Sequence, residues 1–94
     1  MGVDVVVNGH DHDYERFAPM DAGGNVNANG VRAFVVGTGG AVLRDFGTIK
    51  PNSEVRYSGT YGVIMFRLYP NSFEWQFHPV EDKALTDSGT GVCH

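Results

Sequence analysis

Four stretches of the chain carry hydrophobic patterns that predict β-strands. Val3–Val7 is a β-branched run, apolar at nearly every position, which is typical of a strand covered on both faces. Arg32–Val36 is a second apolar run, and glycines follow it. In Tyr61–Tyr69 and Phe73–Val80 the side chains alternate between two faces, as in strands with one buried side. The short link Pro70-Asn71-Ser72 predicts that the last two strands form an antiparallel hairpin.

The segments between these strands favour turns and loops. Asp21–Gly30 contains three asparagines and three glycines, and residues 45–60 have little periodicity, so both are predicted to be surface loops. Residues 81–94 are polar and rich in Gly, Ser and Thr, which predicts a flexible tail. No segment has a convincing helical pattern. The sequence therefore predicts a mostly β structure whose sheet leaves an apolar face in need of a partner.

Length and charge exclude several classes of protein. Ninety-four residues form one domain at most. Seven basic and eleven acidic residues give a net charge of −4, and the basic residues are scattered, so we expect no nucleic-acid binding. No stretch offers the roughly 20 apolar residues of a membrane span. The single cysteine, Cys93, excludes a disulfide within the chain; pairing with a cysteine elsewhere and a free thiol both stay open.

The residues with the clearest chemistry follow the first predicted strand. In an extended segment, residues i and i+2 point to the same side, so His10 and His12 are predicted to direct two imidazoles at one metal or at two adjacent ions. Asp11 and Asp13 are candidate acceptors that would orient those rings. Two histidines do not complete a site, because zinc takes about four ligands. The alternative is an exposed polar loop with two ordinary histidines.

A longer motif surrounds these histidines. The run Asn8–Phe17, with the sequence Asn-Gly-His-Asp-His-Asp-Tyr-Glu-Arg-Phe, resembles the closing Gly-His-x-His motif of calcineurin-like metallophosphoesterases. It is most similar to the purple acid phosphatase-like branch, in which Tyr-Glu-Arg follows the second histidine. The resemblance covers essentially the whole chain, and it continues through Phe34–Ala41, Tyr61–Val63, Trp75 with Phe77, and Asp87–His94.

The resemblance carries expectations about fold and site. It implies an α+β, mostly β segment of a four-layer α/β/β/α sandwich, from a secreted or periplasmic parent protein. His10 and His12 would each bind one of two divalent or mixed-valence metal ions (Fe, Zn or Mn), and the substrate would be a phosphate ester. Asp11, Asp13, Tyr14 and Arg16 would support the metal ligands or contact substrate. For Tyr14 and Arg16, packing and salt-bridge roles remain equally open.

The other ligand motifs of that family are absent. The chain has no Asp-x-His, Gly-Asn-His or Gly-Asp-x-x-Asp motif, and its histidines outside the loop are His78, predicted to lie at the surface, and His94. Residues 1–94 are therefore expected to be the C-terminal portion of a phosphoesterase, inactive alone and without an identifiable catalytic residue. The alternative is a non-catalytic β module that forms homo-oligomers through its exposed sheet. Gly37–Gly40 is predicted to be a tight turn near the metal loop.

Overall fold

The computed structural model describes residues 3–43, 49–80 and 86–93, and within these ranges the chain forms seven strands and no helix. Among these residues, accordingly, no helix is long and apolar enough to cross a membrane. The strands are β1 (Val5–Asn8), β2 (Tyr14–Phe17), β3 (Arg32–Val36), β4 (Ser53–Tyr57), β5 (Gly62–Leu68), β6 (Ser72–Pro79) and β7 (Asp87–Val92).

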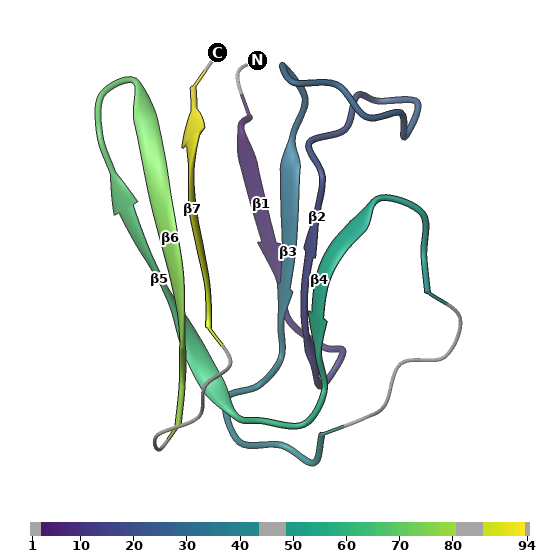
Figure 1. Cartoon of the computed structure of the whole chain (residues 1–94), viewed down its shortest axis with the longest axis vertical. Helices are drawn as coiled ribbons and strands as arrows, with labels where there is room; N and C mark the ends of the chain where they lie inside the picture. The colour runs from purple at the N-terminus through teal and green to yellow at the C-terminus, as the bar shows by residue number, and fades with distance from the viewer. Residues whose placement is uncertain (1–2, 44–48, 81–85, 94) are drawn as a thin grey trace.

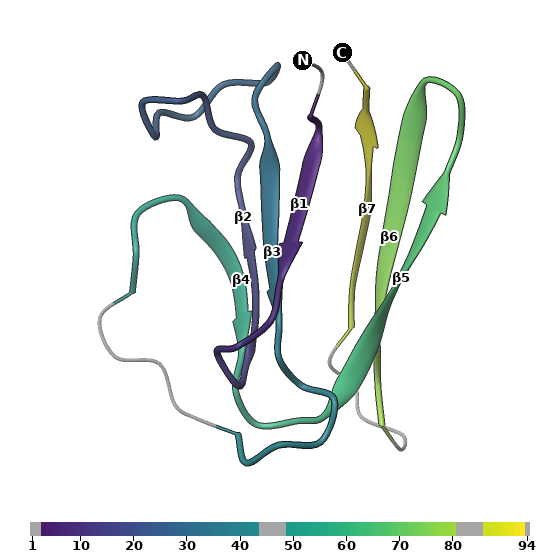
Figure 2. The same cartoon turned by 180° about the vertical axis from the view of Figure 1, so that it is seen from behind.

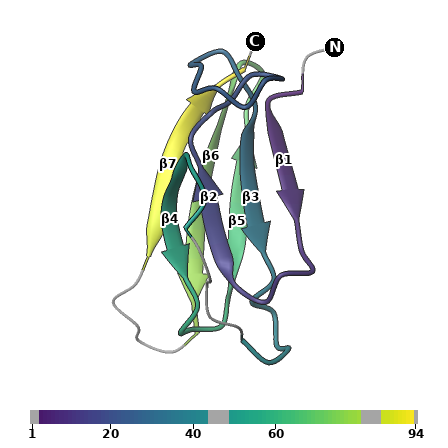
Figure 3. The ribbon, with the colours of Figure 1, turned by 90° about the vertical axis from the view of Figure 1, so that its right-hand side faces the viewer.

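The strands form two sheets that pack face to face (Figures 1 and 2). One sheet has the order β1-β3-β2-β4, in which β1 is parallel to β3 and the other neighbours are antiparallel. The other is the antiparallel sheet β5-β6-β7. In Figure 3 the molecule is viewed onto the face of the sandwich, and the strands of the two sheets overlap. The mostly β class and the β5–β6 hairpin are confirmed; two layers are described, where the resemblance implies four.

Aromatic side chains fill the space between the sheets. Phe73, Trp75 and Phe77 lie on the inner face of β6, as their alternation predicts, and they meet Tyr14 and Phe34 from the opposite sheet. The Phe34 and Trp75 ring centroids are 5.3 Å apart in an edge-on arrangement, and those of Tyr14 and Phe77 are 4.4 Å apart. Each such buried side chain contributes about 1.5–3 kcal/mol, so this cluster is the main source of cohesion between the layers.

A buried threonine also joins the sheets. The Thr38 side chain, fully buried, donates from its Oγ1 to the Gly62 carbonyl at 2.9 Å, and the Gly62 amide donates to the Thr38 carbonyl at 3.0 Å. The end of β3 is therefore attached to the beginning of β5. Both polar groups of Thr38 are satisfied, as burial in the interior requires.

Three strands lie where the sequence predicts none. The strand β2 falls in a segment for which the hydrophobic pattern predicts no strand, and β4 falls within the predicted loop 45–60. The prediction of a flexible tail is wrong for Asp87–Val92, which pairs with β6 along its whole length as β7. Residues 81–85 and 94 lie outside the described part of the chain.

The first strand is less buried than its composition predicts. The expected coverage of Val3–Val7 on both faces is wrong: Val6 and Val7 are 38% and 47% exposed. The reason is position, because β1 is an edge strand with β3 on one side only. Of the valines of β1, only Val5 packs against the aromatic cluster.

Candidate metal-binding loop

The loop Gly9–Asp13 connects β1 to β2 and lies against the end of β3. The Gly37 amide donates to the Asp13 carbonyl at 2.9 Å. A Cβ at Gly37 would lie 1.8 Å from the Asp11 carbonyl oxygen, so only glycine allows this close approach. The predicted proximity to the histidine loop is confirmed for Gly37; a tight turn over Gly37–Gly40 stays a prediction.

The backbone of the loop is tightly turned. The Asp11 amide donates to the Gly9 carbonyl at 3.0 Å, and the Asp13 amide donates to the Asp11 carbonyl at 2.8 Å. These are bonds between residues i and i+2, and His10 has a φ of 78°, which is rare for a residue other than glycine. The extended geometry assumed for His10 and His12 is therefore wrong. Such conformations cost about 1–3 kcal/mol and concentrate at functional sites.

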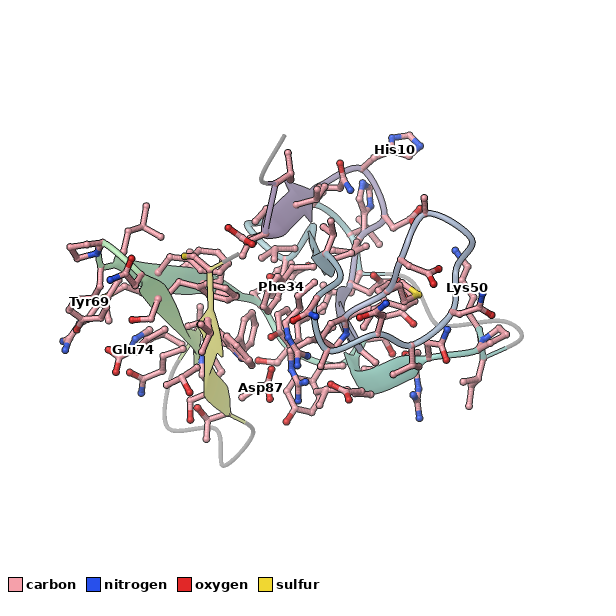
Figure 4. The ribbon with its side chains drawn as sticks, turned by 90° about the horizontal axis from the view of Figure 1, so that it is seen from above. His10, Phe34, Lys50, Tyr69, Glu74 and Asp87 are labelled. Atoms are coloured by element: carbon pink, nitrogen blue, oxygen red, sulfur yellow. The ribbon has the colours of Figure 1, made fainter. Side chains whose placement is uncertain are left out.

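The two histidine rings are in different environments. His12 is half-buried, and its Nδ1 donates to the Val42 carbonyl at 2.7 Å. Since a carbonyl only accepts, this bond places the proton on Nδ1 and leaves the Nε2 lone pair available for a metal. The acceptor that orients His12 through Nδ1 is thus a backbone carbonyl and neither Asp11 nor Asp13. His10 is exposed and projects outward, on the side of the molecule opposite Asp87 (Figure 4).

The two aspartates of the loop also differ. Asp11 is exposed, whereas Asp13 is only 8% exposed and its Oδ1 is buried without a hydrogen-bond partner. Burial raises the pKa of Asp13 above its usual value, and the negative charges of Asp11 and Glu15 raise it further. The carboxylate of Asp13 is therefore held in an unfavourable environment.

Tyr14 and Arg16 point into the molecule, away from the loop. Tyr14 Oη donates to Asp87 Oδ2 at 2.6 Å, and Arg16 donates to both carboxylate oxygens, from Nε at 2.7 Å and from Nη2 at 3.1 Å. Trp75 Nε1 donates to Oδ2 of the same carboxylate at 3.2 Å. Arg16 also forms an ion pair with Glu54. These contacts favour the packing and salt-bridge alternative; a contact with substrate stays a prediction.

Asp87 is a buried carboxylate with several hydrogen-bond donors, and the sequence alone does not identify it as a candidate residue. Burial alone would raise its pKa, but hydrogen bonds from Arg16 and Tyr14 outweigh that effect and hold the pKa below its usual range. Burial and the bond to Asp87 raise the pKa of Tyr14. No periodicity around Asp87 distinguishes it, since its neighbours are Ser, Gly and Thr. Two of its three donors, Tyr14 and Arg16 of β2, lie 73 and 71 residues away in sequence, and the third, Trp75 of β6, lies 12 residues away.

The loop offers part of a metal shell. Imidazole nitrogen suits Zn and Fe, and the free Nε2 of His12 fits that chemistry. Within residues 3–43, 49–80 and 86–93, however, no three His, Cys, Asp or Glu side chains are grouped to hold a metal ion. The remaining ligands of any metal at His10 and His12 would have to be water or groups outside this set.

The remaining candidates lie elsewhere. His78 is exposed on β6, as predicted for a surface histidine. Cys93 is a free, half-buried thiol that packs against the aromatic cluster.

Comparison of the chain with protein-family models, with curated proteins and with solved structures finds no match. The likeness to metallophosphoesterases therefore depends on the Asn8–Phe17 motif and its downstream continuation in this sequence.

Proposed function

We propose that this chain is the C-terminal portion of a metal-dependent phosphoesterase, in which His10 and His12 are ligands of a binuclear metal centre. The observation that supports this best is the bond from His12 Nδ1 to the Val42 carbonyl. Metal-binding histidines commonly donate their second nitrogen to such an acceptor, which fixes the tautomer and the ring orientation. An ordinary solvent-exposed histidine has no need of this support.

In this proposal the chain contributes two metal ligands, and the other ligands come from additional sequence of the enzyme. When bound, two metal ions would polarise a phosphate ester and activate a water molecule. His12 would bind through Nε2, while Val42 keeps its ring in place. Two imidazoles fill only part of a binuclear shell, so additional sequence supplies the other ligands and the 94-residue chain alone is inactive.

The edge strand β1 is the position at which we propose the sheet continues in the whole enzyme. Its free side and the exposed Val6 and Val7 suit a further strand and a covering layer. The four-layer sandwich and a secreted or periplasmic parent protein belong to the same proposal.

Metal binding tests this assignment directly. Zn²⁺ and Mn²⁺ affinities would be measured by calorimetry for the wild-type chain, for the double variant His10→Ala/His12→Ala, and for His78→Ala as a control. We expect stoichiometric binding in the wild type and in His78→Ala, and its loss in the double variant. Equally weak binding by all three proteins would reject the histidine site.

A second candidate is a non-catalytic β module that self-associates. The observation in its favour is the number of large apolar side chains left exposed on strands, including Val6, Val7, Val63 at 62% and Leu68 at 79%. Contiguous exposed apolar surface and open sheet edges commonly mark assembly sites.

A further inference from the structure

Asp13 is the most unusual polar residue among those described. It is 8% exposed, and its Oδ1 is a buried side-chain oxygen with no hydrogen-bond partner. Buried charged groups are normally paired with an opposite charge or coordinate a metal. The Asp13 carboxylate therefore lacks something that buried carboxylates usually have.

The charges around Asp13 make the deficit larger. Glu15, two residues further along and 6% exposed, and the exposed Asp11 both act on the carboxyl group as negative charges. Lys50 acts on it as a positive charge, yet it is not hydrogen-bonded to Oδ1. Asp11 and Glu15 thus both act on Asp13 as like charges, and no positive group among the described residues is hydrogen-bonded to its Oδ1.

Two kinds of partner would satisfy Oδ1. An ordered water would donate a hydrogen bond, but it would leave the repulsion among Asp11, Asp13 and Glu15 unchanged. A divalent cation supplies both the missing contact and the missing positive charge. The environment of Asp13 therefore favours a cation over water.

We propose that Asp13 is an oxygen ligand, through Oδ1, of a divalent cation bound at the Gly9–Asp13 loop. This inference depends on the proposed function, because it adds an oxygen donor to the nitrogen of His12 on the same ion. Imidazole with carboxylate suits Zn²⁺ and Mn²⁺, and water completes the coordination. The unfavourable placement of Asp13 in the metal-free chain is then a cost that binding relieves.

The test compares Asp13→Asn with Asp11→Asn in the full chain. Both substitutions remove one negative charge from the same loop, but only Asp13 has the buried, unpartnered oxygen. Zn²⁺ and Mn²⁺ affinities would be measured by calorimetry, and the melting temperature of each metal-free protein by circular dichroism. We expect Asp13→Asn to weaken binding by at least the roughly 10–100-fold that loss of a residue supporting a metal ligand causes, to melt at the same or a higher temperature, and to bind more weakly than Asp11→Asn.

The outcomes separate this inference from the proposed function. If Asp13→Asn binds like the wild type or like Asp11→Asn while His10→Ala/His12→Ala loses binding, the role of Asp13 is rejected and the histidine site stands. If Asp13→Asn loses binding and the histidine variant does not, the histidine site is rejected, and Asp13 binds a cation without His12, which contradicts the shared ion proposed here. A wild-type chain that binds neither ion would overturn both.

A measurement on the wild-type chain removes any dependence on the folding of a variant. During a Zn²⁺ titration, the side-chain carboxyl ¹³C resonance of Asp13 is expected to shift more than that of Asp11. An Asp13 resonance that stays in place while the ring of His12 responds would reject the inference.

Discussion

The Asp87 carboxylate links its own strand, β7, to side chains of β2 and β6. It accepts hydrogen bonds from Tyr14 and Arg16 of β2 and from Trp75 of β6, and both members of its pair with Arg16 are largely buried. Replacing Asp87 by Asn would remove the buried counter-charge of Arg16 and leave it paired only with the exposed Glu54. We expect a loss of about 3–5 kcal/mol in the free energy of unfolding, measured by urea denaturation.

Glu54→Gln is the matched control for that substitution. Glu54 also forms an ion pair with Arg16, and a second one with Arg32, but its side chain is 41% exposed. Exposed ion pairs contribute about 0–1 kcal/mol. Equal losses in Asp87→Asn and Glu54→Gln would contradict the importance given to burial of the Asp87 cluster.

The lowered pKa of Asp87 makes the free energy of unfolding depend on pH. The folded pKa of Asp87 lies below the unfolded value of about 3.9, so the unfolded chain binds the proton more readily. The stabilisation from Asp87 is therefore complete above the unfolded pKa and is lost as pH falls through the folded pKa. Urea midpoints of the wild type and Asp87→Asn should differ most near neutral pH and converge in acid. A difference that stays constant down to about pH 2 would contradict this.

For the histidine loop, the sequence motif predicts the candidate ligand residues but not the conformation of the backbone. Sequence identifies His10 and His12 as candidates, and the untested metal role still depends on that motif. The conformation of the loop was predicted wrongly, because it is set by tertiary contacts: Gly37 packs against Asp11, and Val42 accepts a hydrogen bond from His12. Every residue has a backbone carbonyl, so the residue types in a sequence do not indicate which carbonyl accepts such a hydrogen bond.

Among the strands, β7 depends on its glycines. A Cβ at Gly89 would lie 2.5 Å from Trp75 Cζ2, an atom of a ring packed within the core. Overpacking of this kind typically costs about 1–3 kcal/mol, and we expect Gly89→Ala to lose that much stability in urea denaturation. Gly59→Ala is the control, since a Cβ there meets nothing within 4 Å. Similar losses in both variants would show that close packing against Trp75 is not the cause.

The strands that sequence predicts and those it misses differ in how they satisfy their inner faces. β5 and β6 are recognisable because their inner faces are aliphatic and aromatic. The inner face of β2 includes Arg16, whose charge is balanced by Asp87, and β7 places glycines against aromatic rings. A hydrophobic pattern cannot reveal a strand whose partner is an ion pair or the face of a ring.

For the molecule as a whole, the two sheets leave four edges of unequal protection. The edge strand β4 carries Glu54 and Arg56, and β5 carries Arg67. The edge strand β7 consists mostly of Ser, Gly and Thr, and its one charged residue, Asp87, is buried. The edge strand β1 has the sequence Val-Val-Val-Asn without a charge or a proline. Charged side chains on an edge discourage pairing with other chains, so β1 is the edge at which self-association is expected.

Self-association through the β1 edge can be distinguished from association through any exposed apolar residue. The mass of the chain in solution would be measured by light scattering after size-exclusion chromatography over a range of concentrations. We expect masses above the 10.2 kDa of one chain at high concentration, and a return to the monomer mass in Val6→Lys. Val26→Lys is the control, because Val26 is more exposed, at 62%, but lies outside the named strands. If both lysine variants dissociate equally, general apolar exposure drives association. If Val6→Lys alone does so, β1 is the interface.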